Sequence, residues 1–219
     1  MEAVLPRRNV MAGLSKDFWD GAERIALECL AHPFVRGLGD GTLSRERYIR
    51  FIAQDAFFLD VFARGFAAGV LRAPDAAGRR MFHELQAGVF EELKLHASVS
   101  QELGIDLAKV VPMEAARGYT DFLLANALTG GLGELIATMT PCMALYGFIG
   151  RRLADEQSGE HTYTRWIETY AGAEFAELVR RMETLLDLYG EGTGGESDRY
   201  QRAMQWEWRF FDEAWRGAE

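Results

Sequence analysis

The chain has 219 residues, of which 48% are hydrophobic and 26% are charged, and its formal net charge is −9 at pH 7. This length suits one domain with a substantial buried core. The negative charge argues against a nucleic-acid-binding protein, because such proteins need a basic face to displace counterions. No stretch of about 18 apolar residues is free of charge, so we expect no membrane span.

Hydrophobic side chains recur at helical spacing along almost the whole chain. Between Tyr48 and Phe62, and again between Val179 and Tyr189, apolar residues return every three or four positions. Glycines and prolines separate these segments, which predicts helices over 15–31, 33–38, 44–72, 75–103, 112–129, 132–156, 160–171, 173–190 and 195–217. Because the connections are short, we expect neighbouring helices to pack antiparallel in an all-α bundle.

Capping and turn residues support these boundaries. Ser15, Ser44 and Asp75 stand where N-caps are expected. The segment Gly130-Gly131-Leu132-Gly133 superficially resembles a phosphate-binding loop. It lacks the Lys-Ser/Thr ending and a preceding strand, so we interpret it as a turn between two helices.

The cysteine content indicates a reducing compartment. Cys29 and Cys142 are the only cysteines, too few for a disulfide framework. Residues 1–14 lack the apolar segment of a secretory leader. We therefore expect a cytoplasmic protein with a flexible N-terminal arm over 1–14 and a single domain over 15–219.

Two carboxylates lie in apolar surroundings. Asp55 falls on the apolar face of the third predicted helix, and Glu207 stands between Trp206 and Trp208. Charged residues rarely point into a core unless they are paired or functional. Burial would raise the pKa of Glu207 and suit it to proton transfer near neutral pH. The structural alternatives are a hydrogen-bonded Asp55 and an ion pair of Glu207 with Arg209 or with a residue of another helix.

Glu92 and His96 are spaced i, i+4 and so share one face of the fourth predicted helix. Such a pair could hold a metal, but di-metal bundles need a second matching motif and further carboxylates. The other histidines, His32, His83 and His161, offer no such motif. We therefore favour a hydrogen-bonded Glu92–His96 pair that supports the core, with no metal site.

The two cysteines differ in their surroundings. Cys29 lies on an amphipathic helix and is interpreted as a buried structural residue. Cys142 follows Pro141 in an apolar, aromatic run. Only a thiolate is nucleophilic, and a free thiol has a pKa near ~8.5, so a reactive Cys142 needs partners from elsewhere in the chain.

Eight short motifs occur in the order and spacing of one known family. They are His32-Pro33-Phe34-Val35, Gly39-Asp40-Gly41-Thr42-Leu43, Gln54-Asp55, Glu92-x-x-x-His96, Tyr119-Thr120, Pro141-Cys142-x-x-x-Tyr146, Tyr163-x-x-Trp166-Ile167-x-x-Tyr170 and Glu207-x-x-x-Phe211. Over nearly its whole length the chain resembles the TenA family, also called thiaminase II or aminopyrimidine aminohydrolase. Cys142 matches the branch that carries its catalytic cysteine in the Pro-Cys segment.

The resemblance implies a haem-oxygenase-like helical bundle without haem or another cofactor, a homotetramer, and a role in thiamin salvage. Family members hydrolyse 4-amino-5-aminomethyl-2-methylpyrimidine to the hydroxymethyl pyrimidine and ammonia, and many also cleave thiamin. The partner expected is therefore a small aminopyrimidine or thiamin. A metal-dependent oxidative enzyme on the same scaffold, and a non-enzymatic regulator or pyrimidine-binding protein, stay open as alternatives.

The resemblance also implies roles for individual residues. Cys142 would be the nucleophile that adds to the pyrimidine ring. Asp55 would hold the aminopyrimidine and assist the cysteine, and Glu207 would be the acid/base for the leaving amine and the incoming water. The substrate pocket would be lined by Tyr119, Tyr146, Tyr170 and Phe58. At the last of these positions family members often carry a tyrosine, and a phenylalanine cannot donate a hydrogen bond.

Overall fold

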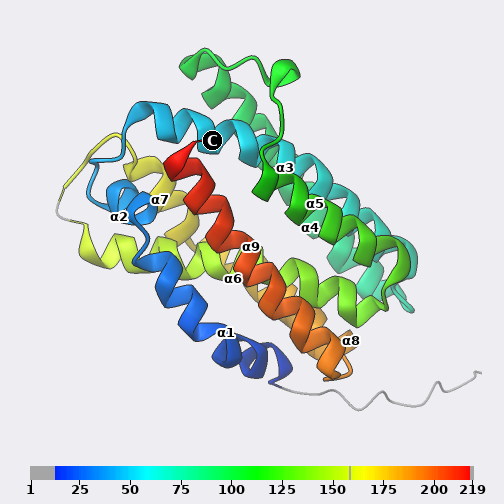
Figure 1. Ribbon diagram of the computed structural model, residues 1–219. Coiled ribbons are helices and arrows are strands. Elements are labelled where there is room, and N and C mark those ends of the chain that lie inside the picture. The colour runs from blue at the N-terminus through cyan, green and yellow to red at the C-terminus, as the bar shows by residue number, and fades with distance from the viewer. Residues whose placement is uncertain (1–12, 158, 218–219) are drawn as a thin grey trace, which may run out of the picture.

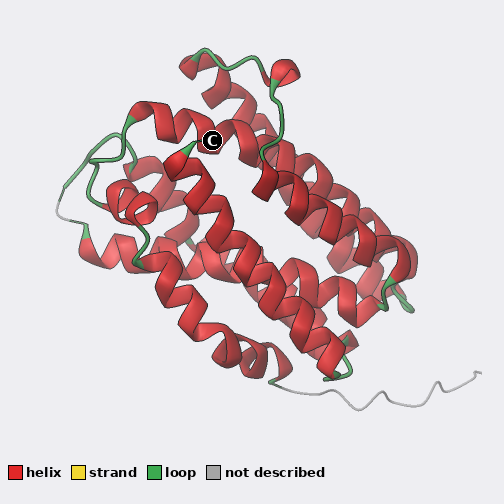
Figure 2. Ribbon diagram, viewed as in Figure 1, coloured by secondary structure: helices red, strands yellow, loops and turns green. Residues whose placement is uncertain are grey.

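The computed structural model describes residues 13–157 and 159–217, and in this part of the chain every regular element is helical (Figure 2). The elements are α1 (Leu14–Leu30), α2 (Pro33–Gly39), α3 (Arg45–Arg72), α4 (Ala76–Leu103), the 3-10 turn η1 (Leu107–Lys109), α5 (Glu114–Thr129), α6 (Leu132–Glu156), α7 (Thr164–Ala171), α8 (Ala173–Tyr189) and α9 (Gly194–Arg216). The all-α prediction is confirmed. The sequence pattern missed η1, and it placed the start of α7 too early.

The central helix is α6, which packs against α7, α8 and α9 and also touches α3 and α5. Figure 1 shows α9 crossing α6, with α1 lying along the other side of α9. By length and composition α6 could cross a membrane, but 78% of its most apolar window is buried inside the protein. Its apolar character is therefore that of a core helix.

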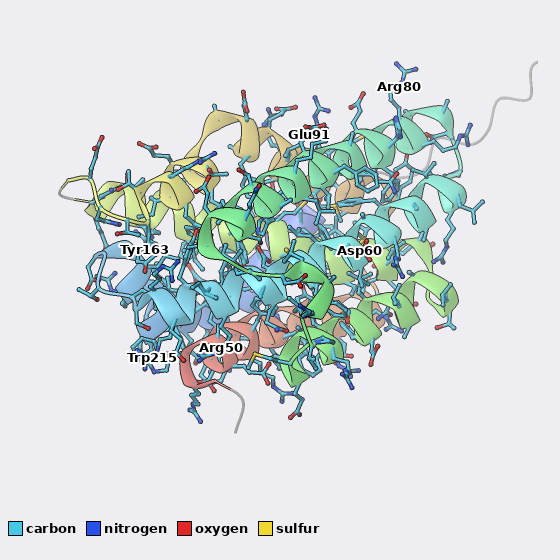
Figure 3. All side chains as sticks on the ribbon, turned by 90° about the horizontal axis from the view of Figure 1, so that it is seen from above. Arg50, Asp60, Arg80, Glu91, Tyr163 and Trp215 are labelled. Carbon is cyan, nitrogen blue, oxygen red and sulfur yellow. The ribbon has the colours of Figure 1, made fainter. Side chains whose placement is uncertain are left out.

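The long helices α3 and α4 form an antiparallel hairpin, and α5 packs on α3. Arg80 and Glu91 project from the outer face of α4, while Tyr163 lies beside the first turns of α3 (Figure 3). The Tyr163 hydroxyl donates a hydrogen bond of 2.6 Å to the carbonyl of Leu43. This bond fixes the connection before α7 against the start of α3.

The predicted N-caps are confirmed at two of three positions. Ser44 accepts a hydrogen bond from the backbone N–H of Arg47, and Asp75 accepts one from Gly78. Ser15 is not a cap: α1 begins at Leu14, and its N-cap is a glycine with φ of 97°. The backbone N–H of Ser15 instead donates to Asp187 at 2.7 Å. Residues 1–12 of the predicted arm lie outside the described residues.

Candidate active site

Two small cavities meet at Cys142, in the middle of α6. One, of about 30 Å³, lies between α3, α4, α6, α7 and α8, and the other, of about 10 Å³, lies between α3, α5, α6 and α9. Asp55, Cys142 and Tyr146 line both cavities. Tyr170 lines only the first, and the second is completed by Phe58, Tyr119 and Glu207. The structure therefore brings all the predicted site residues into one buried region.

Tyr170 reaches this region because α7 approaches α6 closely. A Cβ at Gly150 would lie 2.5 Å from the carbonyl carbon of Tyr170, so a larger residue at Gly150 would force the helices apart. The ring of Tyr170 then packs against Tyr146, with centroids 5.1 Å apart, and against Trp166, at 4.5 Å. These aromatic walls suit a flat heterocycle.

Pro141 alters the helix immediately before the cysteine. It lies inside α6 and has no N–H to donate to the carbonyl of Ala137, four residues earlier. The hydroxyl of Thr140 donates to the neighbouring carbonyl of Ile136 at 2.8 Å. The turn that carries Cys142 therefore has an incomplete backbone ladder.

Asp55 in α3 is paired with His96 in α4. Oδ2 of Asp55 lies 2.7 Å from Nε2 of His96, and the two side chains are 7% and 9% exposed. Burial lowers the pKa of His96, but the hydrogen bond and the charge of Asp55 outweigh burial, and the pKa is raised to about 9. His96 is therefore positively charged near neutral pH and forms a buried ion pair with Asp55.

The predicted side-chain pair between Glu92 and His96 is wrong. Oε1 of Glu92 accepts a hydrogen bond of 2.6 Å from the hydroxyl of Tyr170. Nδ1 of His96 lies 3.1 Å from the backbone carbonyl of Glu92, so the i, i+4 spacing joins His96 to the helix backbone and not to the carboxylate. Both ring nitrogens of His96 are engaged. Within residues 13–157 and 159–217, no cluster of three or more His, Cys, Asp or Glu side chains could hold a metal ion.

Glu207 in α9 is only 3% exposed. Burial raises the pKa of Glu207 to about 8, an effect that the nearby Tyr119 hydroxyl opposes and the charge of Asp55 reinforces. The raised pKa predicted from the sequence is confirmed, and most Glu207 side chains are protonated at pH 7. The alternative ion pair with Arg209 is wrong, because the guanidinium of Arg209 lies over the ring of Trp206, 4.9 Å from its centroid.

The second cavity also holds buried polar atoms without partners. Oε1 of Glu207 and the hydroxyl of Tyr119 make no hydrogen bond to any described residue. An unpaired buried polar atom is costly, and such atoms concentrate at sites that bind polar ligands. A ligand with its own donors and acceptors would satisfy both groups.

Cys142 is partly buried, and the surface that it retains lies at the cavities. Burial raises the pKa of the Cys142 thiol well above its usual value, and the charges of Glu207 and Asp55 raise it further. Because only the thiolate is a strong nucleophile, chemistry at Cys142 requires a base that removes the proton during attack. Cys29 is fully buried, as predicted for a structural residue.

Comparisons with known proteins identify the family of this chain. Residues 19–218 match the TENA/THI-4/PQQC family. A protein named aminopyrimidine aminohydrolase from Helicobacter pylori is 34% identical over 180 residues, which are 80% of this chain and 83% of that protein. The thiamine biosynthesis multifunctional protein ThiED of Corynebacterium efficiens is 32% identical over 208 residues, 92% of this chain but only 28% of that longer protein.

Solved structures share the fold. A protein described as a TenA family transcription regulator, from Silicibacter sp. TM1040, matches with a TM-score of 0.88 at 27% identity, over 94% of this chain and 98% of that one. A domain with a heme oxygenase-like fold from Shewanella denitrificans matches with a TM-score of 0.73 at 12% identity, over 91% of each chain. The predicted haem-oxygenase-like fold is confirmed, and the chain belongs to the TENA/THI-4/PQQC family.

Proposed function

We propose that the protein hydrolyses 4-amino-5-aminomethyl-2-methylpyrimidine to the hydroxymethyl pyrimidine and ammonia, as a step of thiamin salvage. The observation that carries the proposal is the convergence of one thiol and two different carboxylates on one aromatic-walled region. Asp55 is paired with a charged histidine, whereas Glu207 is mostly protonated at neutral pH. The relatives named aminopyrimidine aminohydrolase support this reaction class.

The first half of the reaction uses Cys142 and Asp55. Asp55 takes the thiol proton and transfers it to a pyrimidine ring nitrogen, while Sγ of Cys142 bonds to the adjacent ring carbon. The 4-amino group can then expel the amine on the 5-methylene carbon. Glu207 supplies the proton with which this nitrogen leaves as ammonia.

The second half restores the ring. Water adds to the exocyclic methylene carbon and gives a proton to the Glu207 carboxylate. Breakage of the bond to Cys142 then regenerates the aromatic hydroxymethyl pyrimidine, and the ring nitrogen returns its proton to the thiol. The balance is one water consumed and one ammonia released. Thiamin, which carries a thiazolium at the same methylene carbon, would be cleaved by the same attack and water addition. The thiazole would leave as a neutral molecule without a proton from Glu207, and the proton from the added water would be released.

We also propose that the protein is a cytoplasmic homotetramer, as its family resemblance implies. Two leucines are strongly exposed, Leu71 at 85% and Leu128 at 82%. They lie at the C-terminal ends of α3 and α5, which are joined because Arg72 donates to the carbonyl of Ala127 at 3.0 Å. Such exposed apolar side chains at one end of the bundle are suited to subunit contact. Analytical ultracentrifugation tests the tetramer.

The activity itself is tested by ammonia release from the purified protein. We expect ammonia and hydroxymethyl pyrimidine to form in equal amounts from the aminomethyl pyrimidine. Thiamin should be assayed in parallel, by the appearance of its thiazole half. The proposal would be contradicted if neither compound is turned over by protein whose thermal melting curve shows that it is folded.

A further inference from the structure

A third, larger cavity lies beside the site. It has a volume of about 490 Å³ and is bounded by the start of α3, the C-terminal half of α4 and α7. Small-molecule sites commonly have volumes of about 300–1,000 Å³. The two cavities at Cys142, of about 30 and 10 Å³, accommodate little more than a water molecule each. A substituted pyrimidine therefore fits the large cavity, and fits beside Cys142 only after side chains move.

The large cavity has the chemistry of an aromatic binding site. Tyr48, Tyr163, Trp166 and Tyr170 line it, and the rings of Tyr48 and Tyr163 lie 4.7 Å apart. Trp166 is only 8% exposed, and its Nε1–H has no hydrogen-bond partner among the described residues. A buried indole N–H without a partner calls for an acceptor, and a pyrimidine ring nitrogen is one.

Two hydrogen-bonded pairs separate the large cavity from Cys142. Glu92 and Tyr170 line both the large cavity and the 30 Å³ cavity, and they are joined by the 2.6 Å bond described above. His96 lines the large cavity, while its partner Asp55 lines the small ones. The wall between the two spaces therefore consists of polar side chains that can exchange their partners for a ligand.

We infer that the large cavity is a first binding site for the aminopyrimidine, and that the ring passes from it to Cys142 when the Glu92–Tyr170 hydrogen bond opens. The ring would stack on the aromatic walls, its nitrogen would accept from Nε1 of Trp166 once the buried indole turns that atom toward the cavity, and its amino groups would face the Glu92 carboxylate. The identity of the ligand rests on the proposed function. The route to Cys142 does not.

A competing route exists between α4 and α8. Gly88 and Leu178 line the 30 Å³ cavity on that side, and a Cβ at Gly88 would lie 3.5 Å from Cδ1 of Leu178. Both residues are partly exposed. Substitutions that block the large cavity, or the gap between α4 and α8, therefore distinguish the two routes to Cys142.

The experiment measures how fast a small aromatic disulfide reagent labels Cys142, in a Cys29→Ser background with a single thiol. Thr169→Trp and Val99→Trp each place an indole in the large cavity. Thr169 is exposed, so its replacement disturbs no core packing. We expect both changes to slow labelling by about tenfold or more. With the large cavity blocked, the reagent reaches Cys142 only when the protein opens locally by another route, which happens less often. Glu168→Trp, at the neighbouring exposed position outside the cavity, should stay within about twofold of the parent.

Two outcomes would overturn the inference. Leu178→Trp could slow labelling while Thr169→Trp and Val99→Trp do not, which would assign the route to the gap between α4 and α8. Equal labelling rates in all folded variants would show that the large cavity does not lead to Cys142. Labelling needs no catalysis, so slowed labelling of Thr169→Trp, together with a parent protein that releases no ammonia, would refute the proposed function and leave the route intact.

The ligand is tested with Trp166→Phe, which keeps the aromatic ring and removes the N–H. For hydrolysis of the aminomethyl pyrimidine we expect KM to rise by about three- to tenfold, the value of one hydrogen bond, with kcat unchanged. An unchanged KM would exclude recognition of the ring nitrogen by Trp166. A fall in kcat alone would place the tryptophan in the chemical step instead.

Discussion

His96 and Asp55, 41 positions apart in the sequence, form a buried ion pair 2.7 Å long beside the candidate nucleophile. The pair raises the pKa of His96 from 6.5 to about 9 in the folded protein. Its stabilising effect is therefore fully present below about pH 6.5 and is lost as the pH rises through 9. The loss should amount to at most about 3 kcal/mol in the free energy of unfolding.

His96→Gln tests this relationship, because glutamine can still donate to Asp55 but does not titrate. Urea unfolding at pH 6.5 and at pH 9.5 should show a larger loss of stability in the parent than in the variant. His83→Gln, at an exposed position on the same helix, should behave like the parent. If the parent and His96→Gln lose the same stability between pH 6.5 and pH 9.5, a group other than His96 governs the fall in stability at alkaline pH.

Glu207 should set the alkaline limb of activity. Because its pKa is raised to about 8, the protonated form required to release ammonia disappears above that pH. We expect kcat/KM to fall as the pH rises through about 8. Glu207→Gln should lower kcat by about 10²-fold or more and should abolish this limb. Asp198→Asn, exposed on the same helix, should leave the profile unchanged. A wild-type profile that is flat from pH 7 to 9 would contradict this role.

Phe58→Tyr should raise the rate of hydrolysis. The ring of Phe58 packs 4.8 Å from that of Tyr119 and lines the 10 Å³ cavity that also contains Glu207. A hydroxyl added there has two unpaired polar atoms as possible partners, Oε1 of Glu207 and the hydroxyl of Tyr119. One hydrogen bond made only in the transition state is worth about two- to twelvefold in kcat. An unchanged or reduced rate would identify Phe58 as a packing residue.

Chelators should leave the activity unchanged. Both nitrogens of His96 are engaged, one with Asp55 and the other with the backbone, so the Glu92–His96 spacing does not present a pair of free ligands. The measurement compares ammonia release before and after dialysis against a strong chelator, together with the metal content of the protein. Stoichiometric iron or manganese, with activity that is lost on its removal, would favour the oxidative alternative.

The fold was predictable because the relevant signals are local. Spacing of apolar residues located the helices, and the bounds of α6 were predicted without error between Gly131 and Gln157. The start of α7 was predicted too early because a long-range contact, which the local pattern does not show, sets it. The sequence pattern does not separate His161 and Tyr163 from the helix, but Nε2 of His161 donates to the carbonyl of Gly39 at 3.0 Å and keeps this segment outside the helix.

The sequence predicted several residues that line the cavities at Cys142, but not the hydrogen bonds between them. The family motifs named the polar and aromatic residues at Cys142 but missed Phe210 and the apolar lining from α4 and α8. The spacing of Glu92 and His96 suggested a pairing of their side chains, whereas His96 contacts the Glu92 backbone. The bonds of His96 to Asp55 and of Glu92 to Tyr170 join different helices, so their sequence separation carries no signal. One clue was present. A carboxylate at Asp55, on an apolar face, requires a partner, and His96 lies on the adjacent helix of the same hairpin.

The most direct test of the account is Cys142→Ser, assayed for ammonia release from the aminomethyl pyrimidine. Serine is nearly isosteric with cysteine but is a far weaker nucleophile at neutral pH. We predict that hydrolysis falls to the background rate while the melting temperature stays close to that of the parent, and that Cys29→Ser, at the other cysteine, keeps its activity. Turnover near the parent rate in folded Cys142→Ser protein would contradict the cysteine mechanism.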